Sequence, residues 1–175
     1  MEYEIHDNFL PENEFKELQE LITSDKLPWY RINSIVSDKD PVFEDGSDAG
    51  IYQGQFVHIF YTGHEPKSPF YKDIAPLLKK IKPKAIVRIK ANLLTATPNR
   101  VISGLHTDLQ NTWDNLKTAV FYINTNNGAT LFKDGTEIES IANRLVIFKS
   151  NLEHTSVSCT DQKARYVINL NYYDQ

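Results

Sequence analysis

The chain begins with a segment in which apolar residues recur at helical spacing. The segment LPENEFKELQELITSDKLP, from residue 10 to 28, carries one apolar stripe, formed by Phe15, Leu18, Leu21 and Ile22. Pro11 suits a first helical turn, and the glutamates that follow it suit the positive end of a helix. The pattern predicts a helix that is over by Pro28.

The next segments predict a loop, a strand and a second helix. Residues 33–50 are polar and rich in turn-forming residues, which predicts a long surface loop that covers the site. GQFVHIFYTG, residues 54–63, is typical of a strand, on which His58 shares a face with Phe56 and Phe60 as a core or pocket residue. SPFYKDIAPLLKKIKP, residues 68–83, predicts a second helix that Pro76 interrupts or delays.

From residue 84 onward the pattern changes to short strands separated by turns. In residues 84–94, KAIVRIKANLL, apolar positions alternate with Arg88, Lys90 and Asn92. In residues 116–132, LKTAVFYINTNNGATLF predicts a strand, an Asn-Gly turn and a returning strand. Two further predicted strands are RLVIF, residues 144–148, and ARYVINLNYY, residues 164–173. Helices followed by many short strands indicate an α+β chain with an antiparallel sandwich or barrel of the jelly-roll kind.

One short stretch among these strands carries candidate metal ligands. In GLHTDLQ, His106 and Asp108 stand two positions apart, so they point to the same side of an extended chain. His154 directly follows an apolar strand and is the best candidate for a third ligand. Two imidazoles and one carboxylate on one side of an ion form the facial triad that suits non-haem Fe(II). Taken alone, the first two residues are more typical of a surface turn with a local hydrogen bond than of a metal site.

A basic residue opens the last strand. Arg165 lies 11 residues beyond His154, and alternation places it on one face with Val167 and Asn169. If that face points inward, the guanidinium predicts an anionic partner, because a planar fork matches a carboxylate. The face with Arg88 and Asn92 lines either a cofactor pocket or the solvent. Tyr52, Trp113 and Tyr122 line either a substrate groove or the core.

Composition and charge narrow the class of protein. A chain of 175 residues predicts one domain, and a net charge of −4 argues against nucleic-acid binding. The single Cys159 excludes an internal disulfide and agrees with a reducing compartment. The acidic N-terminal segment does not resemble a signal peptide, and no apolar stretch is long enough for a membrane span. These features predict a cytoplasmic protein.

The order of these motifs resembles the Fe(II)/2-oxoglutarate-dependent oxygenases, and most closely their prolyl 4-hydroxylase-like branch. H-x-D, a later histidine and an arginine about ten residues beyond it carry the resemblance. The segments HDNFLPENEFKELQELI, GATLF, NRLVIF and HTSVSCTDQKARYVINL extend it over most of the chain. The resemblance implies a single domain over 1–175. It consists of a double-stranded β-helix core over 84–175 and a helical support over 1–83 packed on one sheet.

The resemblance also implies cofactors, site residues and an activity. His106, Asp108 and His154 hold Fe(II) and form the catalytic set. Arg165 binds 2-oxoglutarate with help from Asn92 or Thr130, and Arg88 is the next candidate. Asn92 stands near the position where prolyl hydroxylases often carry a tyrosine. Dioxygen is the oxidant, and ascorbate is a further candidate cofactor.

The implied reaction hydroxylates an aliphatic C–H of a prolyl, peptidyl or small-molecule substrate and releases succinate and carbon dioxide. Two alternatives stay open. One is a nucleic-acid dealkylating oxygenase with the same iron site, and the other is a non-catalytic cupin-like binding domain in which the histidines are structural. The substrate and the oligomeric state stay open as well.

Overall fold

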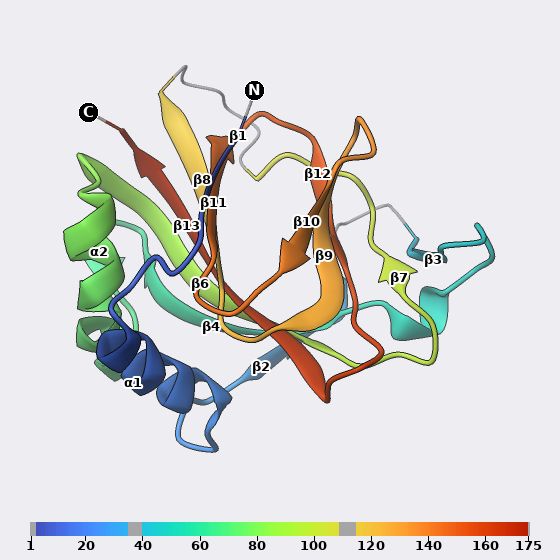
Figure 1. The fold of residues 1–175 in the computed structure, drawn as a ribbon, viewed down its shortest axis with the longest axis horizontal. Helices are drawn as coiled ribbons and strands as arrows, with labels where there is room; N and C mark the ends of the chain where they lie inside the picture. Colours follow the sequence, from blue (N-terminus) through green and yellow to red (C-terminus); the bar gives the residue numbers. More distant parts are fainter. Residues whose placement is uncertain (1–2, 35–39, 109–114, 175) are drawn as a thin grey trace.

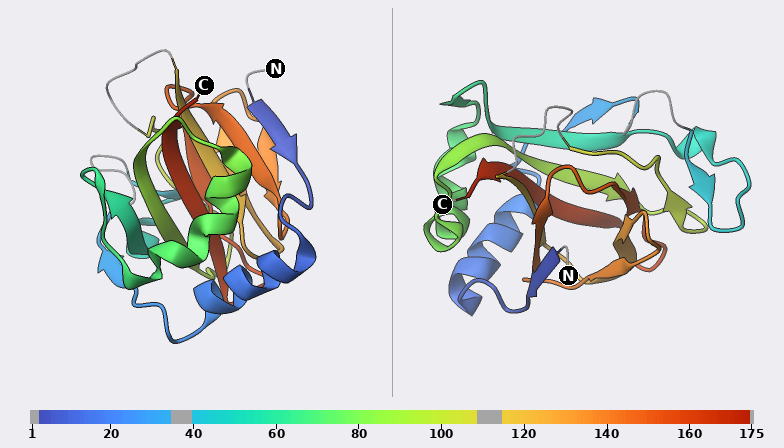
Figure 2. Two further views of the ribbon diagram at one scale, coloured as in Figure 1. Left: turned by 90° about the vertical axis from the view of Figure 1, so that its left-hand side faces the viewer. Right: turned by 90° about the horizontal axis from the view of Figure 1, so that it is seen from above.

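The computed structural model describes residues 3–34, 40–108 and 115–174. Two antiparallel β-sheets face each other, and both α-helices lie against the outer face of the larger sheet (Figure 1). The second view shows the helices crossing that outer face on the side away from the smaller sheet (Figure 2). The sheet that carries helices therefore has two different faces, an outer face toward the helices and an inner face toward the smaller sheet.

The two sheets interleave strands from distant parts of the chain. The larger sheet has eight strands. In spatial order they are β1 (Tyr3–His6), β11 (Leu145–Lys149), β8 (Leu116–Tyr122), β13 (Ala164–Tyr173), β6 (Ala85–Thr95), β4 (Gln55–Thr62) and β2 (Tyr30–Ile32), with β5 (Glu65–Pro66) paired to β4. The smaller sheet has the order β10 (Glu137–Ser140), β9 (Asn126–Phe132), β12 (His154–Val157), β7 (Val101–Ile102) and β3 (Val42–Phe43). This arrangement confirms the predicted α+β jelly-roll architecture.

The helices follow the predicted pattern. α1 (Glu12–Thr23) buries Phe15, Leu18 and Ile22. The second helical segment begins as a 3-10 helix, η2 (Pro69–Ile74), and continues as α2 (Ala75–Ile81) with Pro76 in its first turn, as the delayed start predicted. A short 3-10 helix, η1 (Gly50–Tyr52), precedes β4. Among the described residues, neither α-helix is long and apolar enough to cross a membrane.

Alternation along the strands separates the two faces of the larger sheet. Ile168 and Leu170 of β13 belong to the apolar cluster beneath the helices. Arg165, Val167 and Asn169 of the same strand line a pocket between the sheets. The predicted division of this strand is therefore confirmed, and it places the basic residue inside the sandwich.

Two local predictions were wrong. β8 and β9 do not form a hairpin, because β8 belongs to the larger sheet and β9 to the smaller one. The predicted Asn-Gly turn, residues 127–128, lies inside β9. The segment 33–50 is also not wholly a loop, since β3 pairs with β7 across Val42 and Ile102. Residues 35–39 of that segment lie outside the described residues, and its role over the site stays a prediction.

Candidate metal centre

The two histidines are held side by side by the backbone. His106 and His154 form an antiparallel bridge in which each amide N–H donates to the other's carbonyl oxygen, both at 2.9 Å. Directly opposed residues project to the same face, so the imidazole rings stand with their centroids 4.8 Å apart. His154 opens β12, and this pairing ties the segment that carries the H-x-D residues to the smaller sheet.

Each imidazole is oriented through one nitrogen. His106 Nδ1 lies 3.2 Å from the Gly104 carbonyl oxygen, and His154 Nδ1 lies 2.9 Å from the Leu152 carbonyl oxygen. A carbonyl oxygen only accepts, so each Nδ1 carries the proton and donates it. This leaves both Nε2 atoms as lone-pair donors for a metal ion, the arrangement in which an outer partner sets the tautomer of a histidine ligand.

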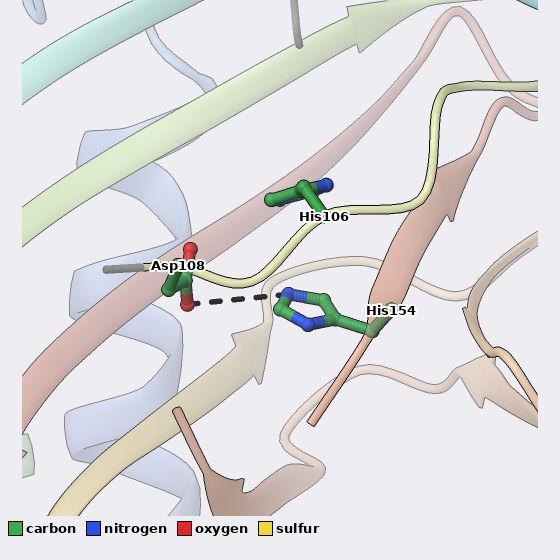
Figure 3. A group of neighbouring side chains, drawn as sticks. All are labelled: His106, Asp108 and His154. Atoms are coloured by element: carbon green, nitrogen blue, oxygen red, sulfur yellow. Dashed lines mark ion pairs between the residues drawn. The ribbon is translucent and has the colours of Figure 1, made fainter. Parts of the chain in front are cut away.

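Asp108 completes the group with a carboxylate that is almost entirely buried. Its Oδ2 accepts hydrogen bonds from Thr118 Oγ1 at 2.8 Å and from Asn171 Nδ2 at 3.0 Å. Arg88 Nη2 lies 3.4 Å from its Oδ1. His154 Nε2 lies 3.9 Å from Oδ2, the contact marked in Figure 3. The carboxylate is thus fixed by donors on three strands of the larger sheet and faces both imidazoles.

The ligand atoms of His106, Asp108 and His154 all lie within 4.8 Å of one another (Figure 3). Protein ligands bind a divalent transition metal at about 2.0–2.2 Å, so small side-chain rotations would close the group around one ion. The donor set is two nitrogens and one oxygen on one side of a pocket, which suits Fe(II) and leaves coordination positions open. The structure therefore brings together the three residues that the sequence singled out.

The electrostatics favour the protonation states that a metal needs. Burial lowers the pKa of His106, and the neighbouring His154 lowers it further, so the ring is neutral at pH 7. Burial opposes ionisation of Asp108, but His154, Arg88 and Lys90 outweigh it and hold the pKa of the carboxyl below its usual value. Neutral imidazole and ionised carboxylate are the forms that coordinate.

Arg165 lies at the other end of the same pocket and has no acidic partner among the described residues. Only 3% of the residue is exposed. Its Nε donates to Ser140 Oγ at 2.8 Å, and its Nη2 donates to Thr130 Oγ1 at 3.1 Å. A buried cation is costly without an anion. The surroundings of this guanidinium therefore suit the binding of an anion.

Tyr122 is one of the three aromatic residues for which the sequence left a groove and a core position open. Its hydroxyl donates to Thr130 Oγ1 at 2.7 Å, and its ring lies 5.5 Å from the Arg165 guanidinium carbon. Register explains the meeting, because Tyr122 is opposite Val167 in the neighbouring strand. Of the other aromatic candidates, Tyr52 lines a second cavity of about 140 Å³, and Trp113 lies outside the described residues.

Buried polar atoms without a partner gather in this pocket. Four buried side-chain atoms of the described residues have no hydrogen-bond partner, and three of them belong to pocket-lining residues: Asn92 Oδ1, Thr155 Oγ1 and Asn169 Oδ1. Nearly all buried polar groups in native proteins are paired, so such a group of exceptions marks a place where a ligand or water completes the structure. Asn92, the predicted substitute for a tyrosine, is among them.

Gly128 has a function that the sequence pattern hid. A Cβ atom built on it would lie 2.7 Å from the Val157 carbonyl oxygen and 2.8 Å from Arg165 Cδ. The glycine is therefore required by the close passage of the arginine side chain and not by a turn. An Asn-Gly pair read from sequence alone does not separate these two reasons.

No protein-family model and no curated protein sequence matches the chain. Solved structures do match its fold. A prolyl hydroxylase from Trichoplax adhaerens, in complex with a peptide fragment of the hypoxia inducible factor oxygen degradation domain, has a TM-score of 0.64 and 15% identity. The match covers 99% of this chain and 84% of that chain.

Two further solved structures share this fold. An oxidoreductase of the 2OG-Fe(II) oxygenase family from Burkholderia pseudomallei has a TM-score of 0.68 and 12% identity, over 98% of this chain and 85% of that chain. The epimerase SnoN, in complex with Fe3+, alpha ketoglutarate and nogalamycin RO, has a TM-score of 0.64 and 12% identity, over 99% of this chain and 79% of that chain. The chain therefore has the fold of these oxygenases, prolyl hydroxylases included, as the sequence resemblance predicted.

Proposed function

We propose that the protein is an Fe(II)- and 2-oxoglutarate-dependent oxygenase. The observation that carries the proposal is one pocket with a His-Asp-His group at one end and a buried, acid-free arginine at the other. A metal triad alone would fit many sites. A triad that shares its pocket with an unpaired arginine suits a dicarboxylate co-substrate, because one carboxylate can bind the metal and the other can bind the guanidinium. A non-catalytic cupin-like domain in which the histidines are structural would not explain why this group and the arginine share one pocket.

Each residue then has a role. His106, Asp108 and His154 would hold Fe(II), which when bound supplies the activation of dioxygen coupled to decarboxylation of 2-oxoglutarate. Arg165 would bind the distal carboxylate of 2-oxoglutarate, with Tyr122 and Thr130 beside it. Asn92 would offer its amide to the middle of the co-substrate. Dioxygen, and ascorbate as a reductant, stay predictions of the resemblance, as does a cytoplasmic location.

For the substrate we infer an aliphatic C–H in a peptide or small molecule. The net charge of −4 works against the phosphate contacts that give most of the affinity for nucleic acid. The fold is shared with a prolyl hydroxylase whose structure holds a peptide. The direct test offers proline-containing peptides and methylated single-stranded DNA in competition and follows product masses. DNA demethylation without peptide oxidation would contradict this inference.

The metal assignment is tested by removing one ligand at a time. His154→Ala, His106→Ala and Asp108→Ala should each lose most Fe(II) binding while circular dichroism stays unchanged, because two protein ligands hold a labile divalent ion weakly. His6→Ala removes an exposed histidine from β1 and is the matched control. Full iron occupancy in His154→Ala would show that the third ligand has been misassigned.

The co-substrate assignment is tested at the arginine. Arg165→Ala should raise the 2-oxoglutarate concentration needed for turnover strongly, since losing one partner of a buried charge pair costs ~2–5 kcal/mol. Arg165→Lys should recover part of this, because the charge remains and the fork geometry does not. Iron content should stay constant in both variants. An unchanged dependence on 2-oxoglutarate would place its carboxylate elsewhere.

A further inference from the structure

Lys90 lies in the same pocket, and apart from its electrostatic effect on Asp108 it has no role in the site described above. It lines the pocket with Asp108 and Asn169, and its neighbours across the sheet are Ile59 of β4 and Asn169 of β13. Among the described residues it makes no hydrogen bond and no ion pair, although it is partly buried. A lysine ammonium carries three donors, so an ammonium withdrawn from water without a partner is costly.

The hydrogen bonds of Asp108 come from other residues. The Asp108 oxygens accept hydrogen bonds from Thr118, Asn171 and Arg88, and the carboxylate faces the metal site. No other acidic residue lines the pocket within the described part of the chain. Within the described part of the chain, no acid therefore forms an ion pair with this ammonium.

The position of Lys90 also separates it from the residues that would anchor 2-oxoglutarate. In the register of β13 and β6, Arg165 pairs with Leu94, whereas Lys90 pairs with Asn169, which lies four residues beyond Arg165 on β13. Four residues of strand span roughly 13 Å. Lys90 thus lies toward the Asp108 end of the pocket, beside Ile59, a large apolar residue that is 36% exposed. A partly exposed apolar side chain therefore lies next to the lysine at this end.

The net charge of the pocket also favours an anionic molecule. Among the described residues, the charged groups around the metal site are the cations Arg88, Lys90 and Arg165 and one carboxylate, Asp108. The charges of Fe(II) and of 2-oxoglutarate cancel each other, so the loaded pocket keeps a positive surplus. Buried charges that lack a complement in the protein select a ligand that supplies one.

We infer that the substrate carries a carboxylate next to its oxidised aliphatic group and that Lys90 binds this carboxylate. The inference rests on the proposed function, because it identifies the substrate class of the same site. Ile59 would contact the aliphatic part. Asn169, whose Oδ1 has no partner among the described residues, would offer that oxygen to an N–H or O–H of the substrate. Free acids and acidic peptide side chains share this chemistry.

The test compares acids with neutral molecules of the same shape. Protein loaded with Mn(II), a redox-inert substitute for Fe(II), and 2-oxoglutarate is titrated calorimetrically with N-acetyl derivatives of proline, leucine and glutamate and with their carboxamides. Peptides that differ only in Glu or Gln form a second arm, which distinguishes a peptide source from a free acid. We expect at least one acid to bind about tenfold more tightly than its amide, the effect of one charge-assisted hydrogen bond.

The variants assign that preference to one side chain. Lys90→Met should weaken binding of the acid about tenfold and leave the amide and 2-oxoglutarate unchanged, whereas Lys90→Arg should keep a preference for the acid. Lys84→Met removes an exposed lysine just before β6 and is the control for net charge. Thermal melts verify that each variant folds.

Three results would overturn the inference. They are equal binding of acids and amides, no binding of any acid, and a preference that survives Lys90→Met while affinity for 2-oxoglutarate falls. The last result would assign Lys90 to the co-substrate. Wild-type protein that binds neither Mn(II) nor 2-oxoglutarate would instead refute the proposed function itself.

Discussion

The outer and inner faces of the larger sheet are built from alternate residues of the same strands, yet they differ in how their polar groups are satisfied. On the outer face, Phe60, Phe121 and Ile168 are fully buried beneath the helices. The buried histidine of that face, His58, contacts the Pro28 carbonyl oxygen at 2.7 Å and Ser68 Oγ at 2.8 Å. The chain thus completes its outer face by itself, as expected for a core histidine.

The inner face contrasts with this in charge and in pairing. Within the part of the chain that the structure describes, it presents Arg165 without an acid, Lys90 without a hydrogen bond or ion pair, and the Asn92 and Asn169 carbonyl oxygens without donors. Burying such groups costs free energy that packing elsewhere must offset. The difference indicates that one face stabilises the fold and that the other is completed only by ligands.

The largest expected effect lies on the outer face. Phe121→Ala removes a fully buried ring that packs edge-on against Phe9 and Phe15. The free energy of unfolding should fall by about 3–5 kcal/mol, because a cavity replaces the ring. Urea denaturation measures the change, and Ile51→Ala, at a side chain that is 87% exposed, is the control. A loss below about 1 kcal/mol would mean that this face is less tightly packed than described.

The second largest effect on stability is expected at Gly128, which packs against Arg165 between the two sheets. Gly128→Ala should lower the free energy of unfolding by about 1–3 kcal/mol, because the new Cβ overlaps the Val157 carbonyl oxygen and the Arg165 side chain. Affinity for 2-oxoglutarate should fall in the same variant, since the arginine must shift. Denaturation and co-substrate titration together measure both. A variant with wild-type values in both would contradict the role given to this glycine.

A smaller effect, of opposite sign, is expected on the inner face. Asn92 lies between Val57 and Val167 on the neighbouring strands, and no described residue hydrogen-bonds to its Oδ1. Asn92→Leu should therefore raise the free energy of unfolding of the ligand-free protein by about 1 kcal/mol and weaken 2-oxoglutarate binding. Ser68→Ala is the contrast, because it leaves His58 Nε2 unpaired on the outer face and should destabilise. Destabilisation by Asn92→Leu would show that this amide is satisfied within the fold.

The smallest effect concerns pH. Burial lowers the pKa of His58, so between pH 6.5 and its depressed folded value the unfolded chain binds more protons than the folded one. Stability of the ligand-free protein should thus fall as the pH drops below 6.5 and level off once the folded histidine is protonated. His106 contributes in the same direction, so the slope of wild type is compared with that of His58→Gln. Equal slopes would mean that His58 titrates normally.

Much of the site could be predicted from sequence because its geometry follows from short-range rules. The i, i+2 spacing of His106 and Asp108 and the alternation after Arg165 need only an extended chain. The hairpin at 127–128 failed because an Asn-Gly pair has the same local preference whether the next strand returns to its neighbour or crosses to another sheet. Tyr122 could not be placed, since its meeting with Arg165 and Thr130 depends on the register of strands far apart in sequence.

What the sequence determined by itself is therefore local: which segments form helices or strands, which residues share a face, and which side chains could bind a metal or an anion. The tertiary structure alone decided which faces meet. It brought His154 against His106 through paired backbone amides, and among the described residues it placed Arg88, and not Lys90, in ion-pair contact with Asp108. Partners of this kind depend on contacts between distant segments, and no local preference of the chain encodes them.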